Sequence, residues 1–256
     1  LNGNQTALMF VYYLIIRWKE LGKINGKEYI VKTIVTTETI KTIAERNGVE
    51  MYDVYTGFKW IANVMRENEG KKNYIGGGEE SYGFLCEDFV RDKDAVSACV
   101  ILAEIAAWAK DQGLSLYQLL QKIYVEYGFS KEKGISVVKK GKSGAEEIEA
   151  MMKKFRENPL TEIAGSKVTY FYDYSTLKGK DYAENETVTL DMPTTSNVLQ
   201  YFTEDNTKVS IRPSGTEPKI KFYCEVHSKV KSIDELPEAE KAAEEKINQI
   251  KASLGI

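Results

Sequence analysis

The segment RPSGTEPK, from Arg212 to Lys219, has the side chains and the backbone expected of an anion site. Arg212 offers a bidentate guanidinium and Lys219 a point charge, and hydroxyl donors come from Ser214 and Thr216. Gly215 can take a positive φ and turn backbone N–H groups inward. The segment therefore predicts a phosphate-binding hairpin, although a polar turn prefers the same residue types and composition alone leaves both interpretations open.

A second candidate is the glycine-rich segment GGGEESYG, which follows a short predicted strand at residues 73–75. A loop after a parallel strand lies at the carboxyl edge of the sheet, where α/β proteins bind ligands. The carboxylates of Glu79 and Glu80, beside Ser81, suit the hydroxyls of a polyol, and only one of two adjacent carboxylates should face it. The alternative is an acidic loop in solvent.

A third candidate is Lys93, in the segment RDKD before a predicted helix that begins at Asp94. The positive end of the helix dipole should lower the pKa of Lys93, and the neighbouring aspartates should oppose that shift. Lys93 could transfer a proton or bind an anion. The alternative is an ordinary N-cap at Asp94 with solvated charges around it.

Composition limits the other classes of function. The 35 basic and 38 acidic residues give a net charge of −3, which implies no general attraction to nucleic acid, and the apolar run Ala7–Ile16 is shorter than the roughly 20 residues that cross a bilayer. Three widely spaced cysteines without a C-x-x-C pair argue against structural zinc and suit a reducing cytoplasm. We expect the single histidine, His227, to lie on the surface at a strand end, and Leu1 in place of Met to mark a processed or truncated product.

The elements that must position these residues fall into two predicted domains, with a boundary near Gly128. Strands alternate with helices over residues 1–129, which predicts an α/β domain with a mixed, mainly parallel sheet. Residues 130–134 read as a linker. Residues 130–256 then predict an α+β domain with an antiparallel sheet, including a half-buried strand at 219–227, and with flanking helices, the last of which has Pro237 in its first turn.

Together these segments resemble the α-D-phosphohexomutases, in the phosphopentomutase-like branch of the phosphoglucomutases and phosphomannomutases. The resemblance covers the whole chain. It is carried by the segments LNGNQTALMFVYYLI, KTIVTT, TGFKWI, GGGEESYGF, RDKDA and RPSGTEPKIKFY. The family has four domains, and this chain resembles the third and the fourth, so residues 1–129 would recognise sugar and residues 130–256 would bind phosphate.

The resemblance implies a role for each matched residue. Glu79 and Ser81 would bind the sugar hydroxyls at positions 3 and 4, and Lys93 would be the candidate general acid/base. Thr56 and Gly57 match a further turn that lines the substrate. The phosphate that does not react would be held by the hairpin residues Arg212, Ser214, Gly215, Thr216 and Lys219.

The resemblance also implies what the chain lacks. The family's phosphoserine and its D-G-D-x-D-R loop, which binds Mg²⁺, have no match here, so we expect no metal site, and we expect the chain to be inactive without the N-terminal half of the same enzyme. The intact enzyme would interconvert hexose 1- and 6-phosphates through glucose 1,6-bisphosphate. Tyr82-Gly83, where some dual-specificity members have Gly-His, favours glucose or ribose over mannose phosphates. The alternative is a non-catalytic module that binds phosphosugars.

Overall fold

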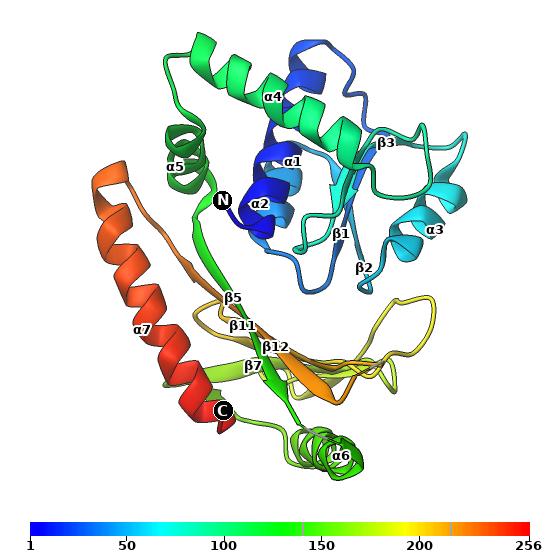
Figure 1. Cartoon of the computed structure of the whole chain (residues 1–256), viewed down its shortest axis with the longest axis vertical. Coiled ribbons are helices and arrows are strands. Elements are labelled where there is room, and N and C mark those ends of the chain that lie inside the picture. Colours follow the sequence, from blue (N-terminus) through cyan, green and yellow to red (C-terminus); the bar gives the residue numbers. More distant parts are fainter. Residues whose placement is uncertain (140, 216) are drawn as a thin grey trace. The chain divides into compact units, whose positions relative to one another are not determined.

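The chain folds into two compact units. The computed structural model describes residues 1–139, 141–215 and 217–256, and the side chain of Lys142 also lies outside the described part. Unit 1 comprises Leu1–Phe129 with Lys229–Leu236, and unit 2 comprises Ser130–Ser228 with Pro237–Ile256 (Figure 1). Among the described helices, none has the length and the apolar character needed to cross a membrane.

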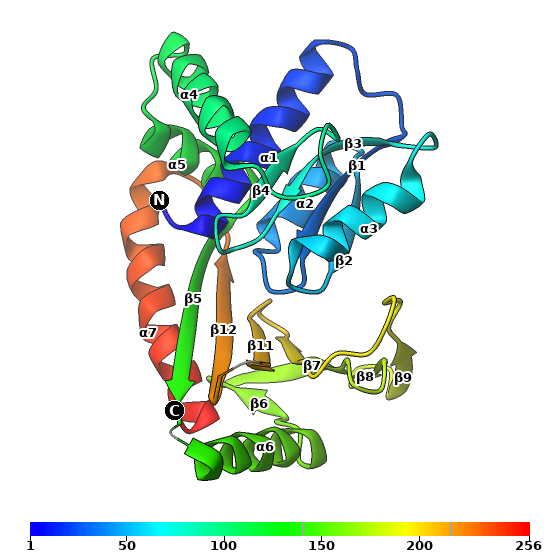
Figure 2. The ribbon, with the colours of Figure 1, turned by 45° about the vertical axis from the view of Figure 1, so that its right-hand side comes forward.

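Unit 1 is a layered α/β structure, as predicted. Its sheet has the strand order β2-β1-β3-β4, in which β1 pairs in parallel with β2 and β3, and β4 is antiparallel to β3. Its elements are α1 (Gly3–Glu20), β1 (Glu28–Thr33), α2 (Thr39–Arg46), β2 (Glu50–Val54), α3 (Phe58–Asn68), β3 (Asn73–Gly78), β4 (Phe84–Cys86), α4 (Ala95–Asp111), α5 (Leu116–Tyr127) and the short η1 (Ile233–Glu235). Helix α3 covers one face of the sheet, and α1 and α2 cover the other (Figures 1 and 2).

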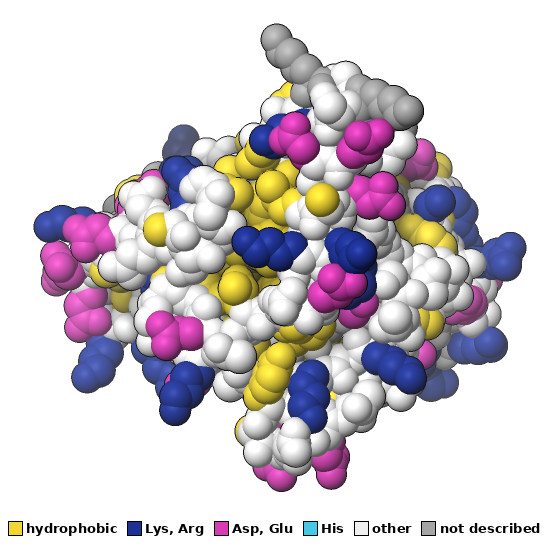
Figure 3. Space-filling model, turned by 90° about the horizontal axis from the view of Figure 1, so that it is seen from below, with side chains coloured by type: hydrophobic (Ala, Val, Ile, Leu, Met, Phe, Trp, Pro, Cys, Tyr) yellow, Lys and Arg dark blue, Asp and Glu magenta, His cyan; other side chains and the backbone are white. Residues whose placement is uncertain are grey.

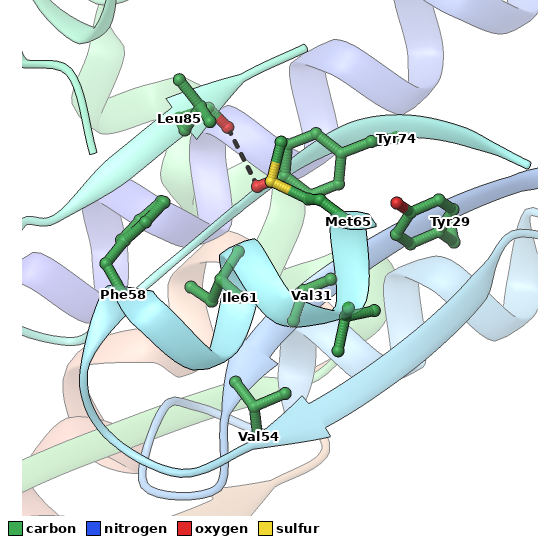
Figure 4. Close-up of a cluster of buried hydrophobic side chains, with 9 residues drawn as sticks. Tyr29, Val31, Val54, Phe58, Ile61, Met65, Tyr74 and Leu85 are labelled. Carbon is green, nitrogen blue, oxygen red and sulfur yellow. Dashed lines mark hydrogen bonds between the residues drawn. The ribbon is translucent and has the colours of Figure 1, made fainter. Parts of the chain in front are cut away.

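The face under α3 holds an apolar cluster (Figure 4). Phe58, Ile61 and Met65 of α3 pack against Val31 and Val54 of the sheet. Their spacing of three and four residues places them on one side of the helix. The Phe58 end of α3 is therefore anchored directly after strand β2, where the candidate turn Thr56-Gly57 lies.

Helix α1 is buried along most of its length, which explains the apolar run at its start. Asn2 begins it with a capping box, in which Asn2 Oδ1 accepts from the Gln5 N–H at 2.9 Å and Gln5 Oε1 accepts from the Asn2 N–H at 3.0 Å. Gly3, in its first turn, lies so close to the turn at residues 79–83 that a Cβ there would overlap the carbonyl oxygen of Glu80. The capped end of α1 thus supports the polyol candidate segment.

The glycine run does not form a loop, and the prediction that it does is wrong. Gly76, Gly77 and Gly78 are the last three residues of β3, and all three are buried. A Cβ on Gly77 would overlap the carbonyl oxygen of Val31, and one on Gly78 would lie 2.5 Å from the carbonyl oxygen of Gly83. Because neighbouring backbone fills the space of a side chain, glycine is required here by packing.

Unit 2 is the predicted α+β structure, with a sheet of strand order β5-β12-β11-β10-β7-β8-β9. The pairs from β12 through to β9 are antiparallel. Its elements are β5 (Phe129–Val138), α6 (Gly141–Glu157), β6 (Glu162–Ile163), β7 (Ser166–Asp173), β8 (Lys178–Asp181), β9 (Glu186–Thr189), β10 (Leu199–Thr203), β11 (Lys208–Pro213), β12 (Lys219–Ser228) and α7 (Leu236–Leu254). The linker predicted at residues 130–134 is wrong, because these residues belong to β5. Lys131 and Lys133 pair there with acidic residues of α7.

The alternation in β12 is confirmed. Its apolar side chains are almost completely buried: Ile220, Phe222, Cys224 and Val226. Phe222 contacts Phe155 of α6 edge to face, with ring centroids 6.3 Å apart. The other face of β12, which carries Lys219, Lys221 and Glu225, therefore points away from α6.

His227 lies at the end of β12, as predicted, but it is partly buried and is not the surface residue that we expected. Its imidazole is 20% exposed, and its Nε2 lies 2.8 Å from Glu225 Oε1, while Glu225 Oε2 lies 2.9 Å from Lys208 Nζ. Burial lowers the pKa of His227, but the charge and the hydrogen bond of Glu225 outweigh burial and raise the pKa above its ordinary value. Burial also raises the pKa of Glu225, but Lys208 and His227 together hold that pKa well below its usual range.

A substitution of Gly77 by alanine should destabilise unit 1. The added Cβ has no space against Val31, so we expect the free energy of unfolding to fall by about 1–3 kcal/mol, the usual cost of overpacking. Tryptophan fluorescence during urea unfolding reports this, because Trp18, Trp60 and Trp108 all lie in unit 1. Gly134→Ala, at a position with open space, should change stability by less than about 0.5 kcal/mol by circular dichroism, and an equal loss in both variants would contradict the packing argument.

The titration of His227 should occur above its ordinary pKa. The protonated imidazole contributes fully to the stability of the folded chain below about pH 6.5, the pKa of histidine in an unfolded chain. This contribution is lost as the pH rises through the raised pKa of His227 in the folded chain. Since the chain has one histidine, its ring resonance in a proton NMR titration is unambiguous. Glu225→Gln should bring the pKa below that of the unmodified protein, and a midpoint under the ordinary value in the unmodified protein would contradict this account.

Candidate active site

The polyol candidate segment is a tight turn between β3 and β4. The Glu79 N–H donates to the carbonyl oxygen of Gly83 at 2.8 Å, which closes the turn, and Tyr82 within it has a left-handed φ of 71°. Glu79 is buried, whereas Ser81 and Tyr82 are exposed. One of the two predicted sugar-binding residues is thus held in place, and the other is open to solvent.

The carboxylate of Glu79 is fixed by the turn that follows strand β2. The backbone N–H of Gly57 donates to Glu79 Oε1 at 2.7 Å, and Gly57 itself has a φ of 112°, which favours glycine. Thr56 is partly buried directly before it. Thr56, Gly57 and Glu79 therefore meet at the carboxyl edge of the parallel strands β2 and β3, where the sequence predicted a site.

Lys93 reaches the same edge. The Asp94 N–H donates to the carbonyl oxygen of Phe84 at 3.0 Å, which ties the segment to β4, and Asp94 caps α4 by accepting from the Ser97 N–H at 2.7 Å. A Cβ on Gly83 would lie 3.0 Å from Lys93 Cδ and 3.1 Å from Glu79 Oε2. Gly83 therefore lies between the two side chains, and a larger residue there would separate them.

The ammonium of Lys93 lies beside a carboxylate and an aromatic ring. Its Nζ is 3.1 Å from Asp92 Oδ1 and 5.8 Å from the centroid of the Phe58 ring. The hydrogen bond from Lys93 lowers the pKa of Asp92, and the hydrogen bonds from Ser97 lower the pKa of Asp94. The side chain of Lys93 is 52% exposed, so its ammonium is accessible to a ligand from solvent.

A buried lysine that we did not predict from the sequence lies in the neighbouring strand β1. Lys32, in β1, is 1% exposed, and its Nζ lies 2.7 Å from Asp53 Oδ1 and 2.9 Å from Glu38 Oε1. It also contacts the carbonyl oxygen of Thr36 at 3.4 Å. Lys32 thus ties the segment after β1 to strand β2, and its position in a buried β-branched run was the available signal.

In unit 2, the phosphate candidate segment is the hairpin between β11 and β12, as predicted. The Ser214 N–H donates to the carbonyl oxygen of Lys219 at 2.8 Å, and Lys219 Nζ pairs with Glu217 Oε2 at 2.7 Å. Thr216 lies outside the described residues. Gly215 does not adopt the positive φ that a glycine can take, and its Cβ position faces open space.

The strand register shows a further residue of this site. Arg212 lies directly opposite Lys221, so two cations face each other across the hairpin on the face away from α6. Neither side chain has an ion-pair partner within the described part of the chain, and both are partly buried. Like charges in such a pair repel each other, so a bound anion would stabilise the hairpin. The alternation of β12 was the signal for Lys221, which we did not predict.

The other side of the hairpin tip borders a cavity. Its volume is about 510 Å³, and it lies between α6 and the tip, where Met152 and Arg156 face Pro213 and Ser214. Arg156 is not free there, because its Nε pairs with Asp173 Oδ2 at 2.9 Å. The tip thus borders open space on the α6 side also.

The described residues contain no metal-binding group, and the face in Figure 3 has no broad basic surface. Within residues 1–139, 141–215 and 217–256, no three histidine, cysteine or acidic side chains are grouped so that they could hold a metal ion. In the face that Figure 3 shows, leaving its grey residues aside, basic side chains are interspersed with acidic ones. A polynucleotide backbone would prefer a continuous basic surface.

Comparison with known proteins agrees with these observations. The family model described as phosphoglucomutase/phosphomannomutase, alpha/beta/alpha domain III, matches residues 2–127, and that of the C-terminal domain matches residues 136–243. A phosphoglucomutase of Staphylococcus haemolyticus is 34% identical over 88% of this chain and 40% of its own length, and one of Staphylococcus aureus is 38% identical over 87% of this chain and 39% of its own. The chain therefore spans about 40% of the length of these relatives.

Solved structures show the same fold at lower identity. The open form of the parafusin phosphoglucomutase from Paramecium matches 100% of this chain and 43% of its own, with a TM-score of 0.60 and 17% identity. A phosphoglucomutase/phosphomannomutase family protein from Burkholderia thailandensis covers 100% of this chain and 42% of its own, with a TM-score of 0.56 and 16% identity. The chain belongs to the phosphoglucomutase/phosphomannomutase family, and it carries that family's domain III and C-terminal domain.

Proposed function

We propose that this chain is the sugar- and phosphate-binding half of a phosphohexomutase, which interconverts hexose 1-phosphate and hexose 6-phosphate. Residues 1–129 would recognise the sugar, and residues 130–256 would hold the phosphate that does not react. The observation that carries the proposal is the cation pair Arg212–Lys221, which faces away from α6 and forms no ion pair among the described residues. A dianionic phosphate is the natural partner for such a pair.

Recognition of the sugar is assigned to the turn at residues 79–83. The fixed carboxylate of Glu79 would accept hydrogen bonds from ring hydroxyls, and Ser81 would donate or accept one more. The N–H of Gly57 holds Glu79 Oε1 at 2.7 Å, which supports the assignment because a positioned acceptor loses little entropy on binding. Thr56 would line the same edge.

Lys93 is assigned as the candidate general acid/base. A group in this role must lie within hydrogen-bond reach of the proton that it transfers, and Lys93 lies beside Gly83 next to the Glu79 carboxylate. A sugar hydroxyl bound by Glu79 would therefore lie close to the Lys93 ammonium. The ammonium would also balance the charge of a phosphoryl group.

On the phosphate side, the hairpin supplies Arg212, Ser214, Gly215, Lys219 and, by its place in the motif, Thr216. Lys221 adds a second cation opposite Arg212. Two fixed charges and the backbone of a proline-stiffened hairpin would bind phosphate with a small ordering cost. The same cradle would serve either end of a bisphosphate.

The reaction itself needs groups from the rest of the enzyme. A phosphoserine there would transfer its phosphoryl group to the sugar phosphate, which gives a free serine hydroxyl and glucose 1,6-bisphosphate. The bisphosphate would then reorient in the site and return its other phosphoryl group to the serine. Mg²⁺ would also be held outside this chain, since the described residues offer no fitting group of ligands. Free cysteines agree with a cytoplasmic enzyme. Tyr82 and Gly83 favour glucose phosphates over mannose phosphates as substrate.

Removal of either cation of the hairpin should weaken phosphate binding by the isolated chain. We expect Arg212→Gln and Lys221→Gln each to raise the Kd for glucose 6-phosphate about 10- to 100-fold, the worth of a charge-assisted hydrogen bond. Isothermal titration calorimetry measures this. Lys178→Gln, at an exposed position in unit 2, is the matched control, and equal affinities in all three variants would contradict the assignment.

In the full-length enzyme, Glu79→Gln should lower kcat/KM for glucose 1-phosphate about 10- to 100-fold, because the carboxylate that accepts from the sugar is lost. A coupled assay of glucose 6-phosphate formation measures it, with glucose 1,6-bisphosphate present. The isolated chain should show no turnover. Interconversion by the isolated chain, or an unaffected Glu79→Gln enzyme, would refute the proposal. Faster turnover of mannose 1-phosphate would refute the substrate preference.

A further inference from the structure

Helix α4 has the composition of a buried helix. Between Ala95 and Ala109 its one charged residue is Glu104, which accepts a hydrogen bond from the Tyr13 hydroxyl at 2.5 Å. A helix that is apolar on every side normally lies inside a protein. In this structure, however, only Ile105 and Ala109 of α4 are fully buried.

Most of the exposed residues of α4 are apolar. The apolar surface called the α4 stripe consists of Val96, Cys99, Val100, Ala103 and Ala107, all of which are exposed. Their spacing of three and four residues places them on one side of the helix. Val96 is 74% exposed and Val100 is 61% exposed. Such a row of uncharged side chains in water indicates a surface that another part of a protein covers.

We propose that the α4 stripe is the docking surface for another domain of the longer enzyme, and this rests on the proposed function. Most of the length of the Staphylococcus haemolyticus relative lies outside the region that this chain matches, since the chain covers 40% of it. The one charged residue beside the stripe is Glu104, which is exposed and accepts a hydrogen bond from Tyr13. The small side chains of the stripe would let an apolar surface approach the helix closely, as in the interior of one protein.

The position of the stripe gives the docking a role in the reaction. Val96 lies three residues after Lys93, and the intervening Asp94 caps the helix. A domain seated on the stripe would therefore border the edge at which Lys93 and Glu79 lie. The surface would place reactive groups of the other domain beside the bound sugar and would exclude water from that side.

Cys99 provides a direct test, because it lies within the stripe. Cys99 is exposed, while Cys86 and Cys224 are buried and burial raises the pKa of each thiol to about 12. In the isolated chain, N-ethylmaleimide should label Cys99 rapidly. In the full-length enzyme, labelling of Cys99 should be at least about tenfold slower, as expected for an interface core. Peptide mass spectrometry assigns the labelled cysteine. Equal rates in the two proteins would overturn the proposal.

A variant of the stripe tests the proposal through the labelling rate of Cys99, which does not depend on enzyme activity. Val100→Asp in the full-length enzyme should restore rapid labelling of Cys99, whereas Val138→Asp, at an equally exposed valine of unit 2, should not. An unchanged rate in Val100→Asp would overturn the proposal. So would protection of Cys99 in a dimer of the isolated chain, which would assign the stripe to a second copy. If Cys99 is protected in the unmodified full-length enzyme but that enzyme has no mutase activity, the proposed function alone is refuted.

Discussion

The sugar edge of unit 1 depends on the absence of side chains along the end of strand β3. Val31 of β1 fills the space beside Gly77, and the turn at residues 79–83 fills the space beside Gly78. Because backbone packs directly against backbone there, the position of Glu79 at the end of the strand is fixed. The N–H of Gly57 donates to the Glu79 carboxylate at 2.7 Å. Larger residues in β3 would move this carboxylate, so the position of the candidate sugar-binding group depends on the packing of the strand.

In unit 2, strands β11 and β12 carry charged side chains in two different arrangements. At one end of the β11–β12 ladder, Lys208 faces Glu225, and the pair is almost completely buried. A buried pair of this kind fixes register more than it adds stability. At the hairpin end, Arg212 faces Lys221 and neither forms an ion pair among the described residues, although the hydrogen bond from Lys219 and the charges of Lys219 and Lys221 lower the pKa of Glu217. The paired end holds the strands together, and the unpaired end remains available for an anion.

The sequence predicted the elements with strong local signals and failed where tertiary packing decides. The start of helix α4 at Asp94 was predicted, and Asp94 caps this helix by accepting from the Ser97 N–H. The buried face of β12 followed from alternation. The glycine run was misjudged as a loop, because the close approach of Val31 leaves no trace in local composition. The charged segment 130–134 was misjudged as a linker, because its lysines are satisfied by α7, more than 100 residues away along the chain.

The central claim is that the hairpin of unit 2 binds phosphate and that the turn at residues 79–83 of unit 1 binds sugar. The most direct measurement is a ¹⁵N NMR titration of the isolated chain with glucose 6-phosphate, which follows the backbone amides of both units. We expect the amides of Arg212 and Ser214 to shift in unit 2, and those of Gly57, Glu79 and Gly83 to shift in unit 1. Unchanged amides in the hairpin, or shifts confined to other residues, would contradict the claim.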